Sequence, residues 1–165
     1  MTRPVHLVAC VGQKQPAPAR ARDLYQSDWF KKARAYVEAK GGRWFILSAL
    51  HGLVPPALVI EPYNLTLADM RAADRRAWGA RVAAQLAATI GARTPVVFLA
   101  GRFYREPLAD WAGDRASVPM EGLGIGAQKA WLAQQLAEIR EREARAAQLD
   151  LFGDCLLYTS DAADE

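Results

Sequence analysis

The chain has 165 residues, with 21 Lys and Arg against 18 Asp and Glu and a net charge of +3. It contains no long apolar run of the length that a membrane-spanning helix needs, and its N-terminus lacks a signal-peptide cleavage site. Cys10 is the only cysteine before residue 155, which excludes an internal disulfide and a Cys-rich zinc site in that part. We therefore expect a cytoplasmic protein with one domain of about 140–150 residues.

The predicted elements alternate between strands and helices. An apolar run at 5–11 predicts a strand, and Ser27 caps a predicted helix that ends at Gly41-Gly42. A strand at 44–49 and a helix over 67–90 follow, and then a strand at 95–101 and a short helix with Tyr104, Leu108 and Trp111 in register. A weaker strand at 116–120 precedes a last helix that starts after the glycines at 122–126. This order predicts an α/β layered domain with a mainly parallel sheet flanked by helices.

The loops that follow the predicted strands carry polar, basic and glycine residues. In a mainly parallel sheet these loops share one edge, where open α/β sheets bind ligands. The residues concerned are Gln13, Lys14, Arg20, Arg22 and Tyr25 after the first strand, Ser48, His51, Tyr63 and Asn64 after the second, Arg102, Tyr104 and Arg105 after the third, and Glu121, Gly122, Gly124 and Gly126 after the fourth. We predict that the four loops meet at one positively charged hollow, the candidate active site.

Each of these residue groups also has a purely structural explanation. The three alternating glycines either hold a phosphate at a helix start or form a tight turn, and Lys14 and Arg22 either contact phosphates or are simply solvated. His51 is either a catalytic or base-contacting group or part of a buried turn, and Glu121 is either a functional acid or a helix-start charge. Ser48 and His51 lack a third triad member and a G-x-S-x-G elbow, so no hydrolase triad is predicted. No metal site and no cofactor are predicted.

Four segments together resemble a known family. "QKQPAPARARDLYQSDWFKKARAYVE", "WFILSALHGLVPP…EPYNLTL", "VVFLAGRFYREPL" and "VPMEGLGIGAQKAWL" are similar to the DUF6884 domain over nearly all of residues 4–136. That family is related to the YaaA peroxide-stress proteins, whose "LSGLYGVL…PY" stretch resembles positions 47–63. The resemblance implies a YaaA-like, uracil-DNA-glycosylase-like fold, and kinship with archaeosine-synthase-type domains that handle nucleobases. The positions that match the family pattern are Lys14, Asp23, Leu24, Tyr25, Ser48, His51, Gly52, Pro62, Tyr63, Gly101, Tyr104, Glu121, Gly122, Gly124 and Gly126.

The end of the chain divides into two parts. Residues 148–152, "QLDLF", resemble the bacterial sliding-clamp-binding peptide of form Q-L-x-L-F, in which Leu149, Leu151 and Phe152 would fill an apolar pocket and Gln148 would bond at its rim. The alternative is the last turn of an amphipathic helix that packs back on the domain. Residues 155–165 back-translate to a string that resembles a transposase adapter used for sequencing libraries, with a natural polar tail as the alternative. We expect a domain at 1–140, a charged helical extension at 141–154 and a non-native tail at 155–165.

Charge and resemblance together favour a protein that acts on DNA. Without Asp161, Asp164 and Glu165, residues 1–154 carry 21 Lys and Arg against 15 Asp and Glu, a net charge of +6, which favours polyanionic partners. The leading hypothesis is a metal-independent DNA N-glycosylase for a modified or damaged pyrimidine. Two alternatives remain open: a non-catalytic DNA-binding module in stress or anti-phage responses, tethered to the sliding clamp, and a small-nucleotide hydrolase or base exchanger.

The glycosylase hypothesis gives the candidate residues distinct roles. Tyr63 or Tyr25 would stack on an extruded base and Asn64 would bind its edge, while His51 or Lys14 would stabilise the departing base anion. Glu121 would stabilise the positive sugar or orient water. Further substrate contacts are expected from Gln13, Ser48, Arg102 and Tyr104, and phosphate contacts from Arg20, Arg22, Gly122, Gly124 and Gly126.

Overall fold

The sheet at the centre of the protein is mainly parallel. The computed structural model describes residues 3–9 and 12–163, with side chains as far as Phe152. Five strands lie in the order β4-β3-β1-β6-β7, at Gly52–Val54 (β4), Trp44–Ser48 (β3), Val5–Ala9 (β1), Val96–Leu99 (β6) and Ala116–Ser117 (β7). β1 is parallel to β3 and β6, and β6 is parallel to β7, whereas β4 is antiparallel to β3. The predicted α/β domain with a mainly parallel sheet is confirmed.

The strand order reverses at β1. The chain passes from β1 to β3 on one side and later returns to place β6 on the other side of β1. The carboxyl ends of β1 and β6 therefore flank a topological switch point, the position at which open α/β sheets bind ligands.

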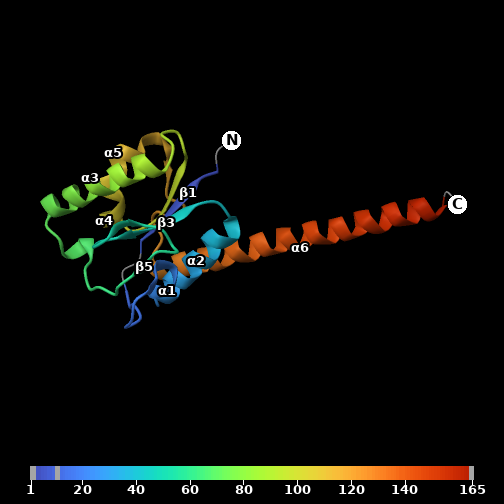
Figure 1. Ribbon diagram of the computed structural model, residues 1–165, viewed down its shortest axis with the longest axis horizontal. Coiled ribbons are helices and arrows are strands. Elements are labelled where there is room, and N and C mark those ends of the chain that lie inside the picture. The colour runs from blue at the N-terminus through green and yellow to red at the C-terminus, as the bar shows by residue number, and fades with distance from the viewer. Residues whose placement is uncertain (1–2, 10–11, 164–165) are drawn as a thin grey trace.

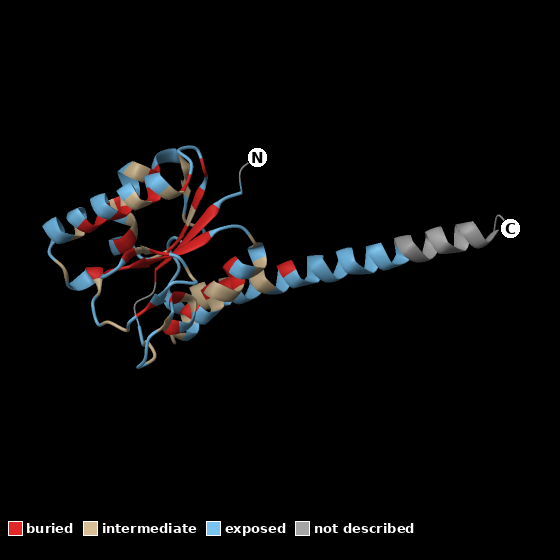
Figure 2. Cartoon of the chain, viewed as in Figure 1, coloured by how far each residue is buried: buried red, intermediate tan, exposed pale blue. Residues whose placement is uncertain are grey.

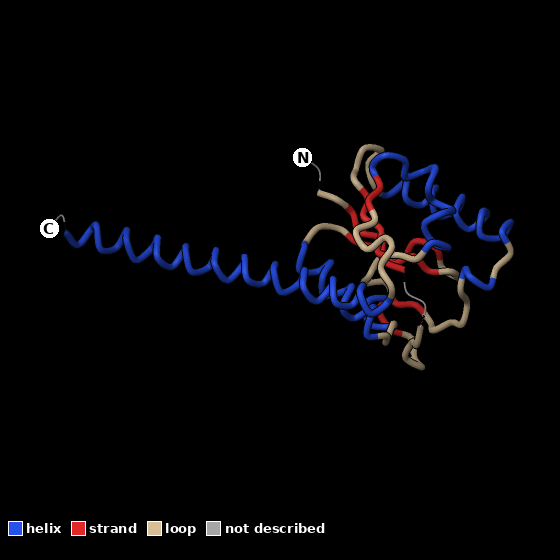
Figure 3. Tube along the Cα trace, turned by 180° about the vertical axis from the view of Figure 1, so that it is seen from behind, coloured by secondary structure: helices blue, strands red, loops and turns tan. Residues whose placement is uncertain are grey.

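Helices cover both faces of this sheet. Figures 1 and 3 show α2 (Asp28–Lys40) and the first part of α6 (Ile125–Ala163) on one face, and α3 (Ala72–Thr89), α4 (Arg102–Arg105) and α5 (Ala109–Ala112) on the other. Neighbouring residues of β1 enter different layers, because Val8 packs with α2 and α6 whereas Leu7 packs with α3. Alternation of side chains along each strand thus fills two separate hydrophobic cores.

Two predicted helices are interrupted. The helix expected over 67–90 is a short 3-10 turn, η1 (Leu67–Asp69), followed by α3, because Met70 and Arg71 are extended. The short helix expected around residues 104–111 is a succession of turns, in which η2 (Glu106–Leu108) separates α4 from α5. Pro107 lies at the start of η2, where it has no N–H to continue α4. A further 3-10 turn, η3 (Gly113–Arg115), leads into β7.

Four short elements in the regions after β1 and β3 were not predicted. The region after β3 was expected to be a loop, but it contains β4, and Gly52 makes the turn from β3 with a φ of 74°. A side chain there would also meet Gln85, whose Oε1 lies 2.6 Å from the position of a Cβ. The loop after β1 contains β2 (Ala19–Arg20), which pairs with β5 (Val59–Ile60) as an antiparallel ribbon, and α1 (Ala21–Leu24). The predicted strand 5–11 is β1 as far as Ala9, and the remaining two residues, including Cys10, lie outside the described part of the chain.

The helix α6 extends beyond the domain. Ile139 is its last buried residue among those whose side chains are described, and residues 140–152 are exposed. Figures 1 and 2 show the second part of α6 as a long exposed projection that contains the predicted extension and the QLDLF segment. Within the described residues, no helix combines the length and the apolar character that crossing a membrane would require.

Candidate functional site

The loop after β1 folds back on itself and fixes the position of Lys14. Lys14 and Tyr25 form an isolated antiparallel bridge. On either side of it, the N–H of Gln15 donates to the carbonyl of Leu24 at 2.9 Å, and the N–H of Gln26 donates to the carbonyl of Gln13 at 2.7 Å. These backbone bonds place Lys14 beside the ring of Tyr25, eleven positions further along the chain.

Tyr63 brings the second loop to the same place. The Tyr25 and Tyr63 hydroxyl oxygens are 2.7 Å apart and share a hydrogen bond. The Lys14 Nζ lies 4.3 Å from the centre of the Tyr63 ring and 5.5 Å from that of Tyr25, and the imidazole of His51 meets the Tyr63 ring edge-on at 5.3 Å. We call these four residues the Lys14–Tyr63 cluster. The structure therefore joins four of the predicted catalytic or stacking loop residues.

The four side chains of the cluster differ in how far they are buried. Tyr25 is almost fully buried, Lys14 and Tyr63 are half-buried, and His51 is exposed. Gln13 and Asn64 are exposed and line an open cavity of about 440 Å³ together with Lys14 and Tyr63. A half-buried ammonium over an aromatic face, with an imidazole alongside and open space in front, can bind or stabilise an anionic planar group.

Ser48 and Tyr104 have structural positions. Ser48 is completely buried, and its hydroxyl accepts a hydrogen bond from the N–H of His51 at 3.0 Å, so it shapes the turn that carries His51. Tyr104 is 4% exposed and packs edge-on against Trp78 in the α3 core. Neither side chain is placed to contact a substrate directly, and we assign both to the scaffold.

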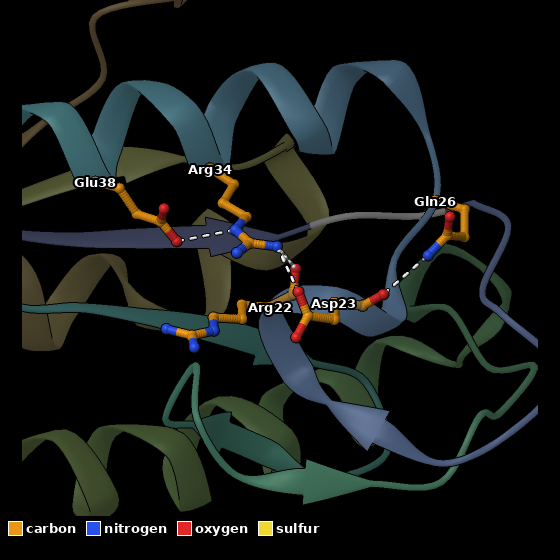
Figure 4. A network of polar contacts seen from close by, with 5 residues as sticks. All are labelled: Arg22, Asp23, Gln26, Arg34 and Glu38. Carbon is orange, nitrogen blue, oxygen red and sulfur yellow. Dashed lines mark hydrogen bonds and ion pairs between the residues drawn. The ribbon is translucent and has the colours of Figure 1, made fainter.

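The two basic residues expected to contact phosphates lie on the β2–α1 segment. Arg20 is exposed, whereas Arg22 is half-buried and its Nε has no hydrogen-bond partner in the described part of the chain. Figure 4 shows the Arg22 guanidinium directed away from the neighbouring Asp23 carboxylate. Asp23 instead binds Arg34 of α2, whose Nη1 lies 2.7 Å from the Asp23 Oδ1 and 2.9 Å from the Arg22 carbonyl, and whose Nε lies 2.8 Å from Glu38. Arg34 thus fastens α1 to α2 and leaves the Arg22 guanidinium outside the ion-pair network.

Glu121 belongs to a second group of residues. Its exposed carboxylate lies 3.8 Å from the Arg105 Nη1, and the two side chains line a cavity of about 190 Å³ with Arg102 and Gly122. Gly122 has a φ of 80°, a conformation that favours glycine, so it supports the turn explanation for this position. Arg102 is paired with Glu106 at 2.8 Å. Within residues 3–9 and 12–152, Lys14 and Tyr63 line one described cavity and Glu121 lines another.

A larger cavity of about 460 Å³ lies at the switch point itself. It is lined by Ala9, Ser27, Asp28, Trp29, Gly101, Ile125, Gln128 and Lys129. Ala9 ends β1 and Gly101 follows β6, while the remaining residues begin α2 and α6. We call it the switch-point cavity. It shares Gly101 and Gln128 with the Glu121 cavity, so the two adjoin.

The family comparison agrees with the resemblance seen in the sequence. A model described as "Family of unknown function (DUF6884)" matches residues 5–134. The chain belongs to the DUF6884 family. No curated protein matches it. The matched DUF6884 region contains the whole sheet, both groups of polar residues and the switch-point cavity, and it ends within the packed part of α6.

Sequence analysis of this DUF6884 domain missed most residues of the switch-point cavity. Trp29 lies in the predicted helix after Ser27 and was not among the candidate site residues, although its Nε1 donates to the Gln128 Oε1 at 2.8 Å and so joins α2 to α6. Asp28 pairs with Lys32 at 2.8 Å and Lys129 at 3.5 Å, and the pKa of Asp28 is lowered, chiefly because Lys32 hydrogen bonds to its carboxylate. The sequence could have indicated these residues through their position alone, because they lie at the starts of helices that border the strand ends.

The C-terminal candidates lie outside the matched DUF6884 region. Leu149, Leu151 and Phe152 are 72, 67 and 68% exposed, and Gln148 is exposed beside them on α6. These side chains do not pack on the domain. The described residues also contain no group of three or more His, Cys, Asp and Glu side chains that could hold a metal ion.

Proposed function

We propose that this DUF6884 protein is a DNA N-glycosylase that excises a modified or damaged pyrimidine base. The observation that carries the proposal is the Lys14–Tyr63 cluster, in which an ammonium lies 4.3 Å from an aromatic face that His51 meets edge-on. Cleavage of an N-glycosidic bond leaves positive charge on the sugar and negative charge on the base. The aromatic rings can stack on the base, and the cation held beside them stabilises the negative charge that the base gains as it departs.

Each member of the cluster has a defined task in this mechanism. Lys14 and His51 supply hydrogen-bond donors for the oxygen or nitrogen of the base that gains charge as the bond breaks. Tyr63 presents its ring to the base, and Tyr25 keeps that ring in place through the hydroxyl contact of 2.7 Å. Asn64, which lines the same open cavity, binds the hydrogen-bonding edge of the base.

Glu121 acts from the other side of the switch point. Its carboxylate is exposed and paired only loosely with Arg105, at 3.8 Å. In that position it can stabilise the positive sugar or orient the attacking water, provided that the sugar spans the space between the two groups of residues. The basic residues Arg20 and Arg22 provide phosphate contacts beside the extruded nucleotide, and Arg102 provides a further substrate contact.

The resemblance to nucleobase-handling proteins supports the same activity. The similarity to YaaA proteins and the implied kinship with uracil-DNA-glycosylase-like domains fit a sheet that carries its polar residues at the carboxyl edge. The net charge of +6 for residues 1–154 favours DNA as the partner.

A base-release assay tests the proposal. The protein is incubated with duplex and single-stranded DNA that contain a panel of modified pyrimidines, and abasic sites are detected by alkaline cleavage. We expect Lys14→Ala and His51→Ala to lower the excision rate by about 10²–10⁴-fold each. Lys31→Ala, which removes an exposed lysine of α2, is the matched control and should retain the wild-type rate. Absence of release from the whole panel by folded protein would refute the proposal.

The assay also separates the two alternatives. A non-catalytic DNA-binding module would bind DNA with a steep salt dependence, release no base, and keep its affinity in His51→Ala. A small-nucleotide hydrolase or base exchanger would act on free nucleotides with little salt dependence.

The C-terminal part of α6 favours a tether as an accessory role. The QLDLF segment exposes Leu149, Leu151 and Phe152 on a helix that projects from the domain (Figure 2). We propose that it binds the bacterial sliding clamp, with Leu151→Ala plus Phe152→Ala abolishing co-purification with the clamp and leaving base release unchanged. We also propose that residues 155–165 are an adapter scar, so that their deletion should change neither activity nor stability.

A further inference from the structure

The switch-point cavity has the size and the walls of a small-molecule site. Its volume of about 460 Å³ falls within the range of about 300–1,000 Å³ that is typical of ligand pockets. It lies between the carboxyl ends of β1 and β6, where the order of the strands reverses. Location and volume both indicate a binding site that the Lys14–Tyr63 cluster does not account for.

One wall of the cavity is an aromatic side chain that is held in position. The Trp29 Nε1 donates to the Gln128 Oε1 at 2.8 Å, and the Gln128 Nε2 donates to the carbonyl of Leu123 at 2.8 Å. The amide of Gln128 therefore fixes the indole before any ligand arrives. A preorganised indole is a stacking surface for a planar heteroaromatic group, and Ile125 and Ala9 extend its apolar character.

The lining also contains a cation, Lys129, whose contact with its carboxylate partner is long. Lys129 lies 3.5 Å from the carboxylate of Asp28, whereas Lys32 lies 2.8 Å from the same carboxylate. Asp28 is thus neutralised mainly by Lys32, and Lys129 is able to turn to an anionic ligand without leaving that carboxylate unpaired. The group of three charges carries a net charge of +1 beside the indole.

We propose that the switch-point cavity binds a pyrimidine nucleoside monophosphate, with the base against Trp29 and the phosphate at Lys129. This inference goes beyond the proposed function, because it places a nucleotide in a cavity whose lining shares no residue with that of the Lys14–Tyr63 cavity, as a second nucleotide site. The site itself is assigned from its own walls, and it can be tested with a free nucleotide.

Gly101 provides a way to close the cavity without disturbing the fold. It lines the cavity, its φ is −71°, which any residue can adopt, and a Cβ placed on it would have no heavy atom within 4 Å. A leucine at this position therefore meets no protein atom at its Cβ and adds bulk to the lining that the cavity shares with the Glu121 cavity. A graded series of Gly101→Ala, Gly101→Val and Gly101→Leu should reduce the affinity for a ligand progressively.

Isothermal titration of the full chain with thymidine 5′-monophosphate, thymidine and inorganic phosphate tests the assignment. We expect thymidine 5′-monophosphate to bind wild-type protein, and its affinity to fall at least about tenfold in Gly101→Leu and in Lys129→Ala. Thymidine should bind Lys129→Ala and wild type equally, because it lacks the phosphate. Ala80→Leu, an exposed position on α3, controls for the added leucine, and Lys31→Ala controls for the lost charge.

Three results would overturn the inference. They are no binding of thymidine 5′-monophosphate at millimolar concentration, unchanged affinity in Gly101→Leu, and binding of thymidine as tight as that of its monophosphate. If Gly101→Leu does not fold, Gly101→Val and Lys129→Ala decide the question. Base release with no nucleotide binding in this cavity would refute this inference alone, whereas nucleotide binding that Gly101→Leu abolishes, without base release, would refute only the glycosylase proposal.

Discussion

The histidine buried in β1 should make the stability of the protein depend on pH. His6 is 2% exposed, its ring meets that of Tyr36 edge-on, and its Nδ1 has no hydrogen-bond partner among the described residues. Burial, with a smaller contribution from the positive charge of Lys40, lowers the pKa of His6 from 6.5 to about 4. His6 is therefore neutral in the folded protein at neutral pH.

The sign of the effect follows from proton binding in the two states. Between pH 6.5 and about 4 the unfolded chain binds a proton at His6 that the folded chain does not, so acidification favours unfolding. The contribution of neutral His6 is complete above pH 6.5 and is lost as the pH falls toward 4. The lowered pKa corresponds to a total of about 3 kcal/mol, of which about 2 kcal/mol falls between pH 7 and pH 5.

Urea denaturation at several pH values measures this contribution. The free energy of unfolding of wild type should decrease by about 2 kcal/mol more between pH 7 and pH 5 than that of His6→Phe, which keeps an aromatic ring but cannot titrate. His51→Gln, which removes an exposed histidine, is the matched control and should retain the wild-type dependence. Identical pH profiles for wild type and His6→Phe would refute the reasoning.

Four further substitutions test a helix cap, the packing and an ion-pair network, with the free energy of unfolding as the measurement. Ser27→Ala should cost about 1 kcal/mol, because the Ser27 hydroxyl accepts from the N–H of Phe30 at 3.1 Å, and an unchanged midpoint would contradict this cap. Gly79→Ala should cost about 1–3 kcal/mol, because its Cβ would lie 2.5 Å from the side chain of Pro107, whereas the exposed Gly126→Ala should stabilise by about 0.5–1 kcal/mol. Arg34→Ala should cost about 1–2 kcal/mol by releasing α1 from α2 (Figure 4), and a smaller effect than Ser27→Ala would argue against that role.

The sequence was most informative where local pattern and burial agree. β1, β3 and β6 lie inside the predicted apolar runs, because strands covered on both faces require nearly continuous apolar residues. α2 begins after its predicted cap, Ser27, and ends at Lys40, directly before Gly41. By contrast, β4 has three residues and the β2–β5 ribbon has two in each strand, which is too short for periodicity to show.

The candidate site was predictable in its position but not in its grouping. The shared carboxyl edge of a parallel sheet placed Lys14, His51 and Glu121 in the same region. Their grouping depends on contacts that no local pattern encodes, such as the hydroxyl pair that joins Tyr25 to Tyr63 across 38 positions. Trp29 and Gln128 are likewise 99 positions apart and meet through one hydrogen bond. Contacts between residues so far apart in the sequence depend on how the whole fold assembles.

The division of the site constrains any mechanism that uses both halves. The Lys14–Tyr63 cluster follows β1 and β3, whereas Glu121 and Arg105 follow β7 and β6, and the ends of β1 and β6 bound the switch-point cavity between them. Lys14 and Glu121 line different cavities, and the proposed mechanism accordingly uses them on different parts of the substrate. This division suits a substrate whose base and sugar reach different groups of residues. A nucleotide within a DNA strand meets that requirement, because charge of opposite sign develops on its base and on its sugar when the bond between them breaks.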